Sequence, residues 1–107
     1  MLSSTGADKN SFFLYTKTKG QAEEGLKSKK IPVLSIFRPG ALLNRDNDKR
    51  WGEGLLKYLP FFPKIEATDM AKAMRVEAEL ILERKSIYKS DEVNIYNNDQ
   101  IKSLLKI

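Results

Sequence analysis

Residues 31–38 form the segment that most limits how this chain can fold. They read Ile-Pro-Val-Leu-Ser-Ile-Phe-Arg, an almost continuous apolar run with several β-branched residues, and Pro39-Gly40 ends the run. A strand that is apolar on both faces has to be covered on both faces, as in a parallel sheet. Pro32 is compatible with the start of such a strand, where a missing N–H costs little. The run therefore predicts a buried parallel strand.

The other elements are predicted from hydrophobic spacing, capping residues and turn residues. Met1–Ser4 has the character of the end of a buried strand, and Thr5–Asn10 has the composition of a turn. A helix then connects this strand to the one at 31–38, which makes a βαβ unit. The full prediction is an α/β chain with strands near 1–4, 31–38 and 93–96 and helices near 11–29, 52–59, 69–83 and 98–106.

Spacing also predicts which helix faces are buried and where the helices begin. The expected inward stripes are Phe12, Tyr15, Lys19, Ala22 and Leu26 on the first helix and Ala71, Met74, Ala78 and Ile81 on the third. The expected N-caps are Asn10 or Ser11, then Thr68, then Asn97 or Asn98. Gly20 and Gly25 should each weaken the first helix by about 1 kcal/mol relative to alanine, although Gly20 could instead mark a close approach. Leu59–Pro63 is expected to be a packed corner, with a lid over a pocket as the alternative.

Two absent residue types exclude several kinds of chemistry. The 107 residues include no Cys and no His, so we expect no disulfide, no thiol nucleophile, no Ser-His-Asp triad and no metal site. The net charge is +5, but carboxylates alternate with the basic residues. This pattern favours an ordinary solvated surface over a nucleic-acid partner. No apolar run approaches the ~18 residues of a membrane span, and no signal peptide is visible, so we expect no membrane partner.

Tyr15 and Lys19 are the residues best suited to chemistry. Four residues span about 1.1 helical turns, which places both side chains on one face, roughly 6 Å apart. A phenol is a poor acid or base at neutral pH, and a neighbouring ammonium favours its phenolate form. A hydroxyl from Ser3 or Ser4 could hold a substrate carbonyl while the phenol gives or takes its proton. The spacing alone is common by chance, and the alternative is a half-buried tyrosine beside a solvated lysine.

The predicted sheet brings these residues to one place. Open parallel sheets bind their ligands beyond the carboxyl ends of the strands. Ser4 ends the first predicted strand, Pro39-Gly40 ends the second, and Tyr15 lies near the start of the helix between them. We therefore expect a site at this edge of the sheet.

Three stretches together resemble the carboxyl-terminal half of an atypical short-chain dehydrogenase/reductase, nearest to the Tat-interactive protein oxidoreductase group. They are Leu2–Lys9 (Leu-Ser-Ser-Thr-Gly-Ala-Asp-Lys), Phe13–Glu23 with its Tyr-x-x-x-Lys-Gly, and Phe37–Gly40 (Phe-Arg-Pro-Gly). The resemblance is dense over residues 1–43 and returns at Ile65–Met74, which is similar to the family's late strand-to-helix segment. It implies that the predicted strands are the carboxyl-terminal portion of a Rossmann-type parallel sheet.

The resemblance also implies a function and a role for each site residue. The family transfers a hydride between NADP or NAD and a small carbonyl substrate. Tyr15 would be the acid/base, Lys19 would bond the nicotinamide ribose and favour the phenolate, and Ser4, or less well Ser3, would orient the carbonyl. Pro39 and Gly40 match the backbone that borders the nicotinamide ring. The implied site is therefore catalytic at Ser4, Tyr15 and Lys19 and cofactor-binding at Tyr15, Lys19, Pro39 and Gly40.

The chain departs from the family in one large respect, because it has no initial strand with a glycine-rich pyrophosphate turn. We expect residues 1–107 to be a single partial NAD(P)-binding domain that is truncated before its dinucleotide-binding half and is inactive alone. The alternative is a non-catalytic regulatory or interaction protein of the Tat-interactive type, with protein partners. We expect cytoplasmic localisation, with the nucleus as an additional site.

Overall fold

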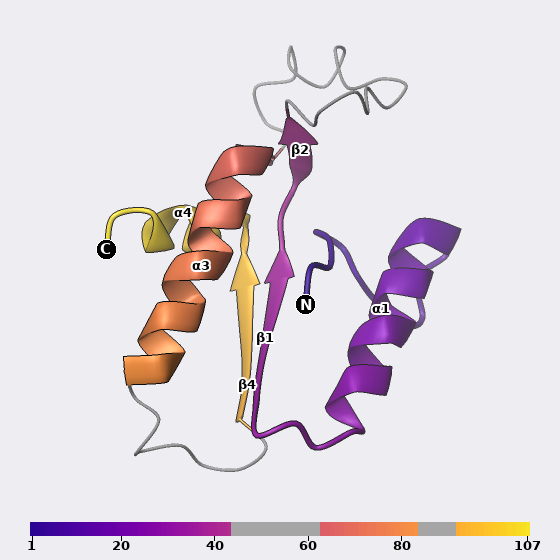
Figure 1. The fold of residues 1–107 in the computed structure, drawn as a ribbon. Coiled ribbons are helices and arrows are strands. Elements are labelled where there is room, and N and C mark those ends of the chain that lie inside the picture. The colour runs from indigo at the N-terminus through magenta and orange to yellow at the C-terminus, as the bar shows by residue number, and fades with distance from the viewer. Residues whose placement is uncertain (44–62, 84–91) are drawn as a thin grey trace.

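The computed structural model describes residues 1–43, 63–83 and 92–107, which form an α/β arrangement (Figure 1). Its strands are β1 (Val33–Arg38), β2 (Ala41–Leu43), β3 (Lys64–Glu66) and β4 (Glu92–Asn97), and its helices are α1 (Leu14–Lys27), α3 (Ala67–Glu83) and α4 (Asn98–Leu104). β1 pairs with β4, and β2 pairs with β3, both in parallel. The predicted fold class is therefore confirmed. The helix predicted near 52–59 and most of the Leu59–Pro63 corner lie outside the described residues.

The amino-terminal segment forms one edge of the main sheet. Leu2 makes a parallel bridge to Phe37. Ser3 N donates to Phe37 O at 2.7 Å, and Thr5 N donates to Pro39 O at 2.9 Å. Because β4 pairs with the opposite side of β1, the order across the sheet is residues 1–5, then β1, then β4. The three predicted strands therefore lie side by side and point the same way.

The two faces of β1 are covered by different helices. Phe37 belongs to the main apolar core, whose buried members are Phe37, Ile65, Met70, Ala73, Val76, Ile101 and Leu104. Arg38, the next residue, faces the other way and contacts Glu23 of α1, as the alternation of side chains along a strand requires. α1 thus covers one face of the sheet, and α3 and α4 cover the other. In Figure 1 the strands lie between α1 and α3.

The predicted inward stripe of α1 is wrong. Phe12, at 96% exposed, precedes the helix, Tyr15 is 50% exposed, and the buried positions of the helix are Gly20 and Glu23. At Gly20 a Cβ atom would lie 2.2 Å from Lys9 N, so the helix approaches the preceding turn through bare backbone. The predicted caps are wrong as well, because the N-cap position is Phe13, which has no side-chain cap.

The predicted stripe of α3 is also rotated from the observed one. Met74 of the predicted stripe is partly buried against the core, but Ala71 and Ala78 are exposed. The buried residues of the helix are Met70, Ala73, Val76 and Glu77. β3 runs directly into α3 at Ala67, so Thr68 lies inside the helix rather than at its cap. The three-residue strands β2 and β3 are too short to give a period in the sequence, so hydrophobic spacing did not predict them. The strand-to-helix junction within Ile65–Met74 was implied only by the family resemblance, and the structure has such a junction there.

Two adjacent asparagines at the start of α4 have different roles. Asn97 caps the helix through a reciprocal capping box with Gln100, which confirms one of the two predicted caps. Asn98 is buried and braces the bend after β1. Its Oδ1 accepts from Gly40 N at 2.9 Å, and its Nδ2 donates to Lys64 O at 3.2 Å. Asn98 thereby joins β1, β3 and α4 at the edge of the sheet where the predicted site lies.

Candidate functional site

The carboxyl ends of the amino-terminal strand and of β1 open into one cavity of about 480 Å³. All predicted site residues line it, together with Leu2 and apolar residues from β2 and α3. The lining consists of Leu2, Ser3, Ser4, Tyr15, Lys19, Pro39, Gly40, Leu42, Ala67, Met70, Ala71 and Met74. Parallel strands end at the same edge of a sheet, and for this reason Ser4 and Pro39 come together although 35 positions separate them in the sequence.

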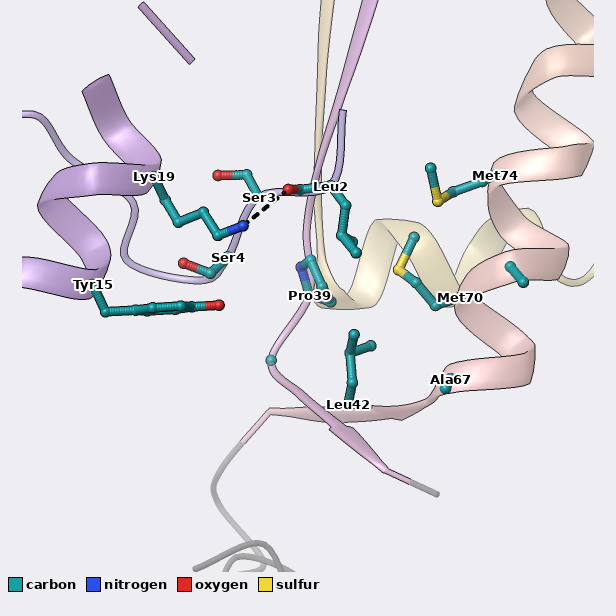
Figure 2. A pocket seen from close by; sticks show the side chains of 12 residues that line it. Leu2, Ser3, Ser4, Tyr15, Lys19, Pro39, Leu42, Ala67, Met70 and Met74 are labelled. Atoms are coloured by element: carbon teal, nitrogen blue, oxygen red, sulfur yellow. Dashed lines mark hydrogen bonds between the residues drawn. The ribbon is translucent and has the colours of Figure 1, made fainter. Parts of the chain in front are cut away.

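Tyr15 and Lys19 extend from the first two turns of α1 toward this edge (Figure 2). The Lys19 Nζ atom lies 5.8 Å from the centroid of the Tyr15 ring, which is near the outer limit of a cation–π contact. Lys19 Nζ also donates a long hydrogen bond of 3.5 Å to Leu2 O. The spacing prediction that both side chains share one helix face therefore agrees with the structure, although that face borders a cavity and not the core.

The two serines differ in their surroundings. Ser4 is 8% exposed, and its Oγ has no hydrogen-bond partner among the described residues. In Figure 2 its side chain lies between Lys19 and Tyr15. Ser3 is also buried, but its hydroxyl lies near the Glu23 carboxylate and helps to lower that group's pKa, without the geometry of a full hydrogen bond. Ser4 is thus the serine better placed to bind a ligand.

An ion pair between buried Glu23 and partly buried Arg38 fixes α1 against the end of β1. Arg38 Nε and Nη2 donate to the two carboxylate oxygens of Glu23 at 2.8 and 2.6 Å. Burial raises the pKa of Glu23, but the hydrogen bonds and positive charge of Arg38 outweigh it, so the pKa lies below its ordinary value. The same contact raises the pKa of Arg38. Glu23 lies one helical turn beyond Lys19, and Arg38 directly precedes Pro39, so the pair sets the separation of the two sides of the cavity.

The backbone at Gly40 is closely packed. A Cβ atom at Gly40 would lie 1.8 Å from Pro63 O, so only glycine fits there without movement of the backbone. The Gly40 N–H is used by Asn98, which leaves the Pro39–Gly40 bend as a wall of the cavity.

The arrangement is suited to chemistry on a polar group beside an apolar surface. A hydroxyl, a phenol and an ammonium converge from the strand end and α1, whereas the opposite wall carries Leu42, Met70 and Met74. Sequence reasoning missed the Glu23–Arg38 pair and this apolar wall. Both glutamate and arginine occur in the stretches that carry the family resemblance, but an ion pair 15 positions apart leaves no spacing signal.

The described residues contain neither a cluster of metal ligands nor a helix that could cross a membrane. Among residues 1–43, 63–83 and 92–107, no three acidic side chains come together in a way that could hold a metal ion. Within the same ranges, no helix is long and apolar enough to cross a membrane.

Comparison with known proteins gave relatives that match part of the chain. Protein HTATIP2 of Rattus norvegicus is 47% identical over 57 residues, which are 53% of this chain and 24% of the rat protein. Protein FMP52, mitochondrial, of Lodderomyces elongisporus is 34% identical over 83 residues, which are 67% of this chain and 35% of that protein. No family model matches the chain. The chain spans about a quarter to a third of the length of these curated relatives.

These relatives bear on two of the sequence predictions. They support the predicted resemblance at the level of the family, that of NAD(P)-binding proteins similar to short-chain dehydrogenases/reductases. The predicted cytoplasmic and nuclear localisation is wrong by the same comparison, because several relatives carry the word mitochondrial in their names.

Proposed function

We propose that the chain carries the catalytic part of an NAD(P)-dependent oxidoreductase of the short-chain dehydrogenase/reductase type, which reduces a small carbonyl compound or oxidises the matching alcohol. Residues 1–107 would be a partial NAD(P)-binding domain, the carboxyl-terminal portion of the parent sheet. The observation that carries the proposal is that Ser4, Tyr15, Lys19 and Pro39 line one shared cavity at the carboxyl ends of parallel strands.

The residues present fit the nicotinamide end of such a cofactor. The buried Ser4 hydroxyl has no described partner. The Lys19 ammonium lines the same cavity, and within the described part of the chain its hydrogen bond is the long one to Leu2 O. Lys19 would hold the nicotinamide ribose, and the Pro39–Gly40 wall would border the ring. The sequence has no glycine-rich turn for a pyrophosphate, so the affinity of these 107 residues for a whole dinucleotide should be low.

In the proposed reduction, the bound nicotinamide would supply a hydride to the carbonyl carbon. Ser4 donates a hydrogen bond to the carbonyl oxygen and holds it beside the Tyr15 hydroxyl. Tyr15 gives its proton to that oxygen, which completes the alcohol, and the Lys19 ammonium stabilises the phenolate that remains. Oxidation of the alcohol runs through the same groups in reverse.

The test is turnover after completion of the site. The chain is mixed with a separately produced amino-terminal segment of the rat relative, and NADPH oxidation is followed with a panel of ketones. Tyr15→Phe is expected to lower kcat at least about 100-fold with cofactor binding unchanged, because one proton transfer is removed. Lys19→Ala should lower kcat and also weaken cofactor binding. Lys17→Ala, at an exposed position of the same helix, should change neither kcat nor cofactor binding. No NADPH binding in the mixed protein, or equal turnover by Tyr15→Phe, would contradict the proposal.

A second candidate function is a non-catalytic interaction protein. It is favoured by the exposed apolar residues before and at the start of α1, where Phe12 is 96%, Phe13 71% and Leu14 78% exposed. Apolar side chains gathered at one place on a surface are typical of interaction sites. In this function a protein partner would bind equally well to Tyr15→Phe and to the unchanged chain. The double variant Phe12→Ser/Phe13→Ser would no longer bind the partner. The names of the fungal relatives favour mitochondria as the place where either function is carried out.

A further inference from the structure

The cavity has two chemically different halves, and this division indicates what it binds. Its polar half is made by Ser3, Ser4, Tyr15 and Lys19, from the amino-terminal strand and α1. Its apolar half is made by Leu2, Leu42, Met70, Ala71 and Met74, from the strand edge, β2 and α3. Figure 2 shows Ser3, Ser4, Tyr15 and Lys19 on one side and Met70 and Met74 on the other, with Pro39 and the apolar side chains of Leu2 and Leu42 between them.

The apolar half offers a ligand contact area without polar partners. Met70 lines the cavity but is 3% exposed, because it also belongs to the main core, whereas Met74 is partly buried and Ala71 is exposed on the same helix. Most of the contact area is therefore offered by Met74 and Ala71. Methionine side chains are flexible and adapt to aliphatic groups of varied shape. A hydroxyl-rich ligand would lose its hydrogen bonds to water against this wall and regain none. The wall therefore favours an aliphatic chain over a sugar-like body.

The polar half fixes the other end of the ligand. Lys19 is the only charged residue among the described lining residues, and the proposed function assigns it to the cofactor ribose. What remains for the substrate is the pair of hydroxyls of Ser4 and Tyr15, which suits a neutral carbonyl oxygen. The cavity thus matches a molecule with a carbonyl at one end and an aliphatic chain at the other.

Taking the proposed function as its basis, we propose that the substrates are aliphatic carbonyl compounds of medium chain length, with the chain against Met70, Ala71 and Met74. Ala71 then determines specificity for chain length, because it lies at the rim where a larger side chain would fill the apolar half. The affinity should rise about threefold to fourfold for each methylene added, the usual gain for burying such a group.

The experiment uses the 107-residue chain and measures displacement of 1-anilinonaphthalene-8-sulfonate by 2-hexanone, 2-octanone and 2-decanone. The unchanged chain should show the stepwise rise in affinity. Ala71→Phe should abolish this stepwise rise and should weaken the binding of 2-decanone at least tenfold. The matched control is Ala78→Phe, two turns along the same helix, exposed but outside the cavity, and it should behave like the unchanged chain.

Further variants and outcomes keep the two proposals separate. If Ala71→Phe does not give the circular dichroism of the unchanged chain, Met74→Ser serves instead and should also flatten the series. A flat series in the unchanged chain, or equal losses in Ala71→Phe and Ala78→Phe, would overturn the inference. The ketone-binding measurements need no cofactor. If affinity rises with chain length but the mixed protein does not turn over NADPH, the proposed function is refuted and the inference about the cavity is not. If the mixed protein turns over short hydroxylated ketones and affinity does not rise with chain length, only the present inference is refuted.

Discussion

Arg38→Met is expected to lower the free energy of unfolding by about 3 kcal/mol at pH 7, the lower end for losing one partner of a buried ion pair, because the Arg38 side chain is itself 30% exposed. The reason is that Glu23 is 2% exposed and would be left with a buried charge. A loss of this size is a large fraction of the stability of a small domain. Urea unfolding followed by circular dichroism measures it. The same change should also disturb the cavity, because the pair joins α1 to the strand end that precedes Pro39.

The matched control for this prediction is Arg75→Met. Arg75 pairs with Glu79 at 3.1 Å along the surface of α3, where the two side chains are 63% and 56% exposed. An exposed pair of this kind contributes only about 0.5 kcal/mol. Both substitutions remove an arginine from an Arg–Glu pair, so the difference between them isolates burial. Equal losses in the two variants would refute the assigned role of Glu23–Arg38.

The pH dependence of the same pair has a definite sign. The pKa of Glu23 in the folded chain lies below its ordinary value of 4.5. The contribution of Glu23 to the free energy of unfolding is therefore fully present above pH 4.5 and is lost as the pH falls through the lowered pKa. In Arg38→Met burial, the largest single influence on the Glu23 carboxyl, would be opposed only by the Ser3 hydroxyl and the Lys27 charge. We therefore expect the pKa of Glu23 to rise in this variant, and its contribution to the free energy of unfolding to decrease as the pH rises. Unfolding curves at pH 7 and pH 4 should show this reversal, and Glu23→Gln should remove both dependences.

Gly20→Ala and Gly25→Ala are expected to have opposite effects, although both glycines lie in α1. At Gly20 a Cβ atom would come within 2.3 Å of the backbone of Asp8 and Lys9, so we expect a loss of about 3 kcal/mol, the upper end for overpacking. At Gly25 a Cβ atom would meet nothing within 4 Å, so alanine should stabilise the helix by about 1 kcal/mol. Urea unfolding of the two variants measures both changes. Destabilisation by Gly25→Ala, or a neutral Gly20→Ala, would contradict the described packing of α1.

The fold was predictable where a long apolar run or a change of composition carries the signal. The run at 31–38 predicted β1, and Pro39-Gly40 predicted its end, because few other structures bury a strand on both faces. The parallel order then brought Ser4, Tyr15, Lys19, Pro39 and Gly40 to one edge, and all five line the observed cavity. That part of the candidate site followed from topology, whereas the roles of these residues rest on the family resemblance and on the proposal above.

The helix faces were not predictable, for physical reasons that differ between the two helices. α1 packs through Gly20 and Glu23, one without a side chain and one charged, so its buried face has no hydrophobic signal. The apolar residues of α3 lie along two neighbouring lines of the helix surface, one that includes Met70 and one that includes Ala71. A repeat of three and four residues fits either line, so spacing alone does not decide which one is buried. Only the partner that each helix packs against, β1 for α1 and the core around Phe37 for α3, decides the face.

The most direct test of the central claim, that this cavity receives a nicotinamide beside Tyr15 and Lys19, is saturation-transfer NMR of the 107-residue chain with reduced nicotinamide mononucleotide. This ligand needs no pyrophosphate or adenine site. We expect saturation of the nicotinamide ring protons that persists in Tyr15→Phe and in Lys17→Ala and is lost in Lys19→Ala. Absence of transfer to the unchanged chain at millimolar ligand, or equal transfer in Lys19→Ala, would contradict the claim.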